Sequence, residues 1–106
     1  MVAMAVANSE FTMTCGEHLE RFFGAGPDAA LQKRAAKALR FLATTEKPLP
    51  GRPEGWAAGI VYELATRGRR ACGVPGILNG DFEALFGVSM GTIRKRAAQI
   101  GELLAL

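Results

Sequence analysis

Residues 56–65 read WAAGIVYELA, and they give the strongest indication of the fold. It is apolar on nearly every side rather than along one stripe, which is typical of a helix enclosed by other elements. A buried strand would also tolerate such a run, but its alanine content and the lack of flanking strand patterns favour a helix. We therefore expect a central helix that begins with Pro53 and Glu54 and stops at Gly68, after Arg67. Its small residues, Ala57, Ala58 and Gly59, would let a neighbouring helix approach closely.

An amphipathic helix precedes the central one. Its apolar side chains follow the helical repeat and share one side, namely Leu31, Ala35, Ala38, Leu39 and Leu42. The opposite side carries Lys33, Lys37 and Arg40, a pattern typical of a basic face in contact with water. Asp28 follows Pro27 at the start, where a carboxylate suits the unpaired backbone N–H groups of a first turn.

The beginning of the chain is less regular. Thr14 and Glu17 have the spacing of a capping box, which predicts a helix that starts there and ends near Gly24. Ahead of it, Phe11, Met13 and Cys15 alternate with threonines at the period of a strand. Residues 1–13 are therefore an extension that fits a frayed helix, a short strand or a disordered tail, and residues 14–106 form the domain.

The last third predicts two short helices joined by a tight turn. Phe82, Leu85 and Phe86 form the apolar face of the first, and Gly87 follows where a left-handed residue ends a helix. Ser89 then offers an N-cap for a second helix. We expect its apolar side chains to point inward, and they are Ile93, Ala97, Ile100 and Leu104. Helix, turn and helix over about residues 79–104 make a helix-turn-helix within an all-α domain.

Composition limits the classes of function. The chain has 106 residues, which suit one domain, and 49% of them are hydrophobic, enough to build a core. Its formal net charge of +3 permits nucleic-acid binding without requiring it. Two cysteines and His18, the single histidine, supply no zinc-type ligand set, and two packed thiols suit a reducing cytoplasm better than a disulfide. We expect no export signal and no membrane span.

Nothing in the sequence indicates catalysis. No candidate nucleophile has a partner residue to act as its base. The sequence also has no phosphate-binding loop and no pair of carboxylates with supporting residues. Trp56 and Tyr62 would be a stacking platform if exposed, but within an apolar helix we expect them in the core. We therefore expect a binding protein rather than an enzyme, with no cofactor, no metal and no small-molecule substrate.

The segments GWAAGIVYELATRGRR (55–70), GVPGIL (73–78) and FEALFGVSMGTIRKRAAQI (82–100) together resemble a cyclin-like repeat of the TFIIB family of general transcription factors, which includes archaeal TFB. The resemblance implies a cyclin-like five-helix bundle whose fifth helix enters the DNA major groove, with Gly91, Thr92 and Arg94 at the matching positions. The chain departs from the family by having one repeat and no zinc-ribbon cysteines. It also carries Gly91 and Ala97 where such factors often have larger residues.

The basic cluster on the last helix defines the expected DNA-binding site. With the apolar stripe inward, Gly91 and Lys95 face outward, and Arg94 and Arg96 lie on opposite flanks from which they would reach phosphates. A second cluster follows the central helix and would add phosphate contacts or favour that helix's dipole. The expected DNA-binding residues are Ser89, Gly91, Thr92, Arg94, Lys95, Arg96, Gln99, Arg67, Arg69 and Arg70.

Two other interpretations accompany this one. The basic residues of the last helix would also suit a solvated face in which Arg94 pairs with Glu83 or Glu102. The domain would then be a protein-interaction module that binds a partner helix without DNA. The other interpretation is an antitoxin or small regulator that uses the same helix-turn-helix. We further expect transcription proteins as partners, a cytoplasmic or nucleoid location, and a homodimer held by the apolar N-terminus and the tail Leu103 to Leu106.

Overall fold

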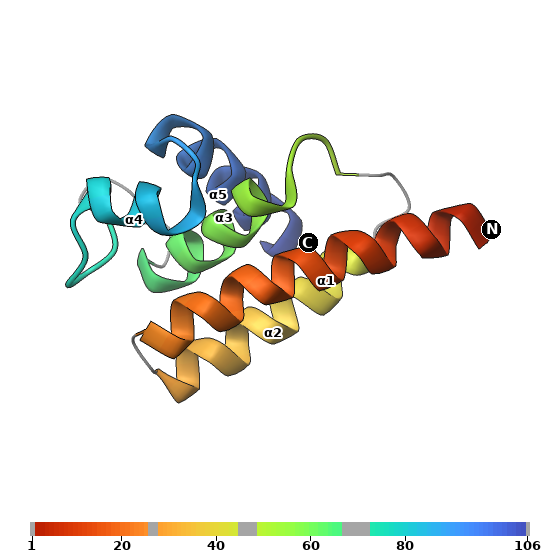
Figure 1. Cartoon of the computed structure of the whole chain (residues 1–106), viewed down its shortest axis with the longest axis horizontal. Coiled ribbons are helices and arrows are strands. Elements are labelled where there is room, and N and C mark those ends of the chain that lie inside the picture. Colours follow the sequence, from red (N-terminus) through yellow and green to blue (C-terminus); the bar gives the residue numbers. More distant parts are fainter. Residues whose placement is uncertain (1, 26–27, 45–48, 67–72, 106) are drawn as a thin grey trace.

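The computed structural model describes residues 2–25, 28–44, 49–66 and 73–105, and within these ranges it contains five α-helices and no strand (Figure 1). The helices are α1 (Val2–Ala25), α2 (Ala29–Ala43), α3 (Pro53–Thr66), α4 (Asn79–Phe86) and α5 (Met90–Ala105). The prediction of an all-α chain is thus confirmed.

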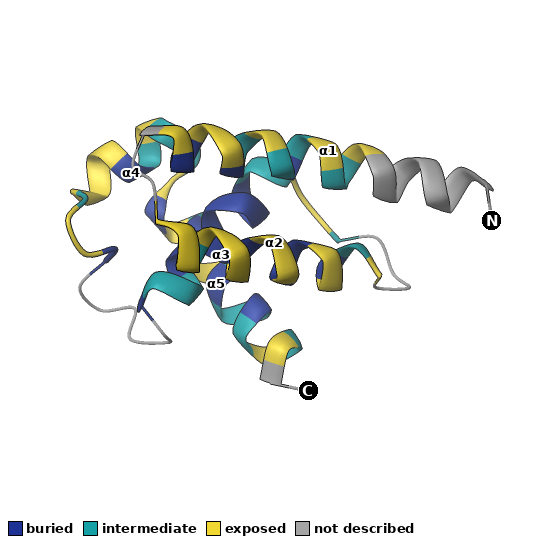
Figure 2. Ribbon diagram, turned by 90° about the horizontal axis from the view of Figure 1, so that it is seen from below, coloured by how far each residue is buried: buried dark blue, intermediate teal, exposed yellow. Residues whose placement is uncertain are grey.

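Helix α3 occupies the centre, and α1, α2, α4 and α5 all pack against it. Its residues from Gly55 to Tyr62 are buried without interruption, as the ribbon coloured by burial shows (Figure 2). Trp56 is 1% exposed and Tyr62 0% exposed, which confirms both as core residues. The Trp56 indole Nε1 donates a hydrogen bond to the carbonyl oxygen of Pro50 at 2.8 Å, so the one polar atom of this buried ring is satisfied.

Helix α1 includes residues 2–13, so of the three alternatives left open for this extension the helical one is confirmed, while the expected helix start at Thr14 is wrong. It is continuous from Val2, so Thr14 lies in its interior rather than at its start, and the strand alternation around Met13 has no counterpart. Cys15, Leu19 and Phe22 are buried and recur at helical spacing, and Phe11 packs against the same core. This longer apolar stripe outweighs a local alternation of three residues, because only a helix can turn all four side chains toward α3.

Helices α1 and α2 form an antiparallel pair whose inner faces cover α3 (Figures 1 and 2). The Asp28 side chain caps α2 by accepting a hydrogen bond from the Leu31 N–H at 3.1 Å, as predicted. The predicted amphipathicity is confirmed as well. Ala35, Ala38, Leu39 and Leu42 are buried, while Lys33, Lys37 and Arg40 are exposed.

Helices α4 and α5 meet at a turn that the sequence predicted. Gly87 has φ 70° and ψ 29°, the left-handed conformation, and its N–H donates to the Glu83 carbonyl at 2.7 Å to end α4. Phe82 and Phe86 attach α4 to the core through ring contacts with each other and with Phe22 of α1. This fixes the point from which α5 begins.

Some expectations concern residues outside the described ranges. These are the stop of the central helix at Gly68, the second cysteine Cys72, and the arginine cluster Arg67, Arg69 and Arg70. Cys15 of α1 is a free thiol and is fully buried.

Candidate nucleic-acid interface

Helix α5 presents one face to solvent along its first turns. Ile93, Ala97 and Ile100 are 0% exposed and pack against α3, which leaves Gly91 and Lys95 on the opposite side of the helix. Leu104, expected to point inward with the other three, is 38% exposed. It lies in the last turns of α5, near the end that projects from the bundle in Figure 2, so no core remains there to cover it.

Two side-chain caps hold the start of α5. The Ser89 hydroxyl accepts a hydrogen bond from the Thr92 N–H at 3.3 Å, which confirms Ser89 as the N-cap. The Glu83 carboxylate of α4 accepts a bond from the Met90 N–H at 2.6 Å. A charged acceptor at this end is favoured both by the unpaired N–H groups and by the helix dipole. Glu83 thereby fixes α5 relative to α4.

Arg94 and Lys95 are the exposed cations of the helix. Arg94 lies on the flank of α5 toward α3, where its Nε is 3.5 Å from the Tyr62 hydroxyl, a distance at the long limit for a hydrogen bond. This contact orients the Nε end of the Arg94 guanidinium, and Arg94 remains exposed to solvent. Gly91 adds no side chain to the same surface, and beyond Ser89 Oγ at 3.9 Å a Cβ placed there would meet nothing within 4 Å.

Contrary to the prediction, Arg96 does not extend from α5 into solvent. It is only partly exposed, and its guanidinium carbon lies 4.8 Å from the centroid of the Trp56 ring, within cation–π range. Its Nη1 donates to the Gln99 side-chain oxygen at 2.8 Å. Its Nε is buried and has no hydrogen-bond partner in the described part of the chain. Arg96 and Gln99, both expected to contact DNA, are therefore engaged with the protein itself.

Three glycines lie close to Arg96, and Gly59 in particular leaves room for its stem. A Cβ at Gly59 would meet the Arg96 Cβ at 2.8 Å, and one at Gly55 would meet its Cγ at 3.7 Å. A Cβ at Gly51 would overlap the guanidinium itself. The absence of side chains at these positions leaves a channel along α3 that the arginine stem fills, so the helices approach closely as the small residues predicted.

A groove of about 340 Å³ lies beside the start of α5. Its lining is Gly51, Arg52, Gly55, Val88, Ser89, Thr92 and Arg96. Arg52 is a residue that sequence reasoning missed, although its side chain is 73% exposed and stands at this groove. No pattern along the chain could have found it, because residues 52 and 89 are brought together only by the packing of α3 against α5.

Arg52 forms an ion pair with Glu54, with 2.6 Å between Nη2 and Oε2. A backbone hydrogen bond at Glu54 itself, followed by the hydrogen bond and charge of Arg52, lowers the pKa of the Glu54 carboxyl, although partial burial opposes this. Glu54 is thus an anion in the first turn of α3, where the helix dipole favours one.

Other kinds of site receive no support from the side chains that the structure describes. Among them, no three His, Cys, Asp or Glu residues lie close enough to share a metal ion. His18 faces Arg21, whose Nη2 donates to its Nδ1 at 3.0 Å. None of the described helices combines the length and apolar character that crossing a bilayer demands.

Comparison with known proteins identified no relative of this chain. No protein-family model matches the chain, and neither a curated protein nor a solved structure does.

Proposed function

We propose that the protein binds double-stranded DNA by inserting the N-terminal half of α5 into the major groove, with α4 and α5 acting as a helix-turn-helix. The observation that carries this proposal is the outward face of α5, where Gly91, Arg94 and Lys95 are exposed while the opposite face is buried on α3. A cationic helix face that begins at a rigid turn and has a glycine at its first positions suits close approach to base pairs.

The cations around this face would act in two ways, some by direct contact with DNA and one by supporting α5. Arg94 and Lys95 would contact phosphates on either side of the groove, and Arg52 would contact the phosphate next to the start of α5. Arg96 would act indirectly, by holding α5 against Trp56. Thr92 is half-buried, lines the groove beside the start of α5, and would meet a base edge or a backbone oxygen of the DNA.

The resemblance to a cyclin-like repeat supports the same use of the fifth helix. It also supports a role in transcription, in contact with transcription proteins and at the nucleoid of the cytoplasm.

The test is duplex binding measured by fluorescence anisotropy across salt concentrations. We expect affinity to fall steeply with salt, with a slope reflecting roughly four to six phosphate contacts. The double variant R94E/K95E should weaken binding more than about tenfold and reduce the slope by about two contacts.

The matched control is K33E/R40E, which makes the same change in net charge on the exposed face of α2. It should leave most of the affinity intact, because these residues lie on a different helix. Equal losses in both variants would reduce the binding to a net-charge effect. Negligible binding of the wild type at low salt would refute the DNA proposal and favour the protein-interaction module.

A further inference from the structure

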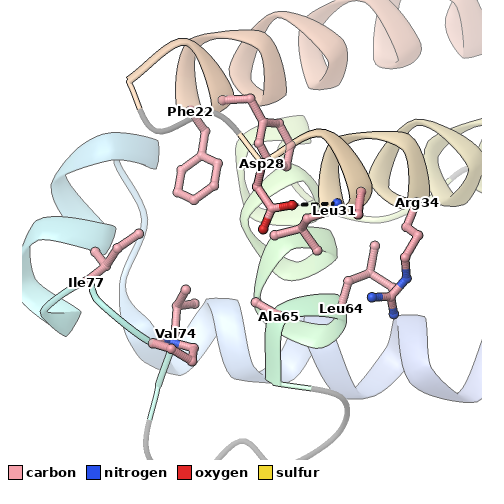
Figure 3. Close-up of a pocket in the computed structure, with 11 residues that line it drawn as sticks. Phe22, Asp28, Leu31, Arg34, Leu64, Ala65, Val74 and Ile77 are labelled. Atoms are coloured by element: carbon pink, nitrogen blue, oxygen red, sulfur yellow. Dashed lines mark hydrogen bonds between the residues drawn. The ribbon is translucent and has the colours of Figure 1, made fainter.

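A second surface, separate from the outward face of α5, runs along α2. Its first part is a cavity of about 510 Å³ where α1, α2, α3 and the 73–78 segment meet (Figure 3). Ile77 and Val74 lie toward one side of this cavity, and Arg34 and Leu64 toward the other. Asp28 also lines it, with one carboxylate oxygen engaged in capping α2.

The second part is a hollow of about 330 Å³ that shares Arg34 and Leu64 with the first. Its remaining lining residues are Lys37, Ala38, Phe41 and Leu104. Because Arg34 and Leu64 line both cavities, the two lie next to each other along α2, with Ile77 beside the first and Leu104 beside the second. We call the two together the α2 groove.

The α2 groove is apolar at its floor and exposed to solvent. Phe41 is 43% exposed and Leu104 38% exposed, and both face the hollow around Leu64. Two large apolar side chains exposed at one concave place are typical of a surface that another element covers. Leu104 follows the buried side chains Ile93, Ala97 and Ile100 along the same side of α5, and its exposed side chain lines this groove.

The charge of the side chains in the α2 groove indicates which kind of partner would bind there. The charged side chains that line the second cavity, Arg34 and Lys37, are both cationic. The whole of α2 contains Lys33, Arg34, Lys37 and Arg40 and no carboxylate. An apolar floor beside a cationic wall is complementary to a helix with one apolar face and acidic flanks.

We propose that the α2 groove binds an acidic amphipathic helix of a partner protein, whose apolar stripe covers Phe41, Leu64 and Leu104 and whose carboxylates pair with Arg34 and Lys37. Asp28 sits at the far end of the groove, so the acidic residues of the partner lie toward the Phe41 end, away from that carboxylate. This function goes beyond DNA binding and does not depend on it. Leu104 and Lys95 lie on opposite sides of α5, so both ligands fit at once.

The probe is a synthetic helical peptide of about 18 residues with leucines at i, i+3, i+4 and i+7 and glutamates on the flanks. Its counterpart carries lysine in place of every glutamate. Anisotropy titrations should show saturable binding of the glutamate peptide and none of the lysine peptide. R34E/K37E should weaken binding by about tenfold, whereas K33E/R40E, with the same charge change outside the groove, should alter it less than about threefold.

Apolar contact is tested separately. Phe41→Ser should abolish measurable binding, whereas Met13→Ser, which removes an apolar side chain of α1 that is 67% exposed and does not line the groove, should leave it unchanged. Circular dichroism of every variant verifies the fold.

Several outcomes would overturn the proposal. Absence of glutamate-peptide binding, or equal losses in R34E/K37E and K33E/R40E, would remove the groove as a specific site. Sedimentation showing that the wild type self-associates and that Phe41→Ser is monomeric would make the groove a contact between copies of this chain. If R34E/K37E weakened duplex binding as strongly as R94E/K95E, the groove would belong to a nucleic-acid surface.

Discussion

The guanidinium carbon of Arg96 lies 4.8 Å from the centroid of the Trp56 ring, so this cation covers an aromatic side chain of the central helix. Arg94 and Lys95, its neighbours in sequence, remain exposed. Consecutive basic residues thus differ in exposure, because helical geometry turns each by about 100° from the last.

Removal of the Arg96 side chain should destabilise the fold. Arg96→Ala loses the stacking on Trp56 and the packing of the aliphatic stem, at a cost of about 1–2 kcal/mol. Arg96→Lys should fall between wild type and alanine, since an ammonium keeps the charge but lacks the planar group. Urea denaturation followed by circular dichroism measures both.

The same variant separates packing from DNA contact. Measured under conditions where both proteins are folded, Arg96→Ala should reduce duplex affinity less than Lys95→Ala does. The reverse order would mean that Arg96 leaves Trp56 to reach a phosphate.

Gly59 should not tolerate a methyl group. A Cβ there would meet the Arg96 Cβ at 2.8 Å and both Ala97 N and Ile100 Cδ1 at 3.1 Å, so Gly59→Ala should push α5 from α3 and destabilise by about 1–3 kcal/mol. The control is Gly24→Ala near the end of α1, where nothing lies within 4 Å. It should be neutral or stabilise by up to about 1 kcal/mol, because alanine is the better helix former. Thermal unfolding of the two variants compares them, and similar melting temperatures would contradict close contact at Gly59.

Glu83 should stabilise the start of α5 through its 2.6 Å contact with the Met90 N–H. Glu83→Ala leaves that partly buried donor without its charged acceptor, and we expect a loss of about 1–2 kcal/mol. Glu102→Ala removes an exposed carboxylate from the same helix and should change stability by less than about 0.5 kcal/mol. Faster hydrogen exchange at the Met90 amide in the Glu83 variant alone would localise the effect.

Cys15 should be unreactive in the folded protein. Burial, with a smaller contribution from the Glu54 charge, raises the pKa of its thiol from 9.0 to about 12. In a Cys72→Ser background, alkylation by iodoacetamide at pH 8 should be slow until denaturant is added, because the thiolate is the nucleophile. Rapid alkylation without denaturant would mean that α1 leaves the core readily.

The same pKa shift predicts a pH dependence of stability. The folded state holds the thiol proton more tightly than the unfolded state, so this contribution to stability is complete below about pH 9 and is lost as the pH rises toward 12. Cys15→Ala should show a smaller decline over that window, measured by urea denaturation at successive pH values. An identical decline in both proteins would assign it to other groups.

Much of the fold could be predicted from local pattern. The enclosed helix around Ile60, the cap at Asp28, the left-handed Gly87 and the cap at Ser89 each depend on a few neighbouring residues, whose backbone preferences are visible in the sequence. The start of α1 was missed because the local signal at Thr14 competed with a longer apolar stripe that has meaning only once α3 is present to cover it.

Part of the candidate site could likewise be predicted from local pattern, and part could not. Periodicity alone identified the side of α5 that turns away from the core, including Gly91 and Lys95, because a helix with one buried stripe has only one outward face. Periodicity could not distinguish Arg96 from Arg94, nor bring Arg52 beside Ser89. Both depend on the approach of α3 to α5, and hence on contacts between residues far apart along the chain.

The order of apolar, glycine and capping residues was sufficient to determine that the chain forms helices, where α2 to α5 begin, and which residue ends α4, because these depend on interactions within a few residues. Only the tertiary structure decided which cations stay in water, which one is held against Trp56, and where Phe41 and Leu104 meet. The physical reason is that exposure is set by what packs opposite a side chain, and in this protein that partner lies on another helix.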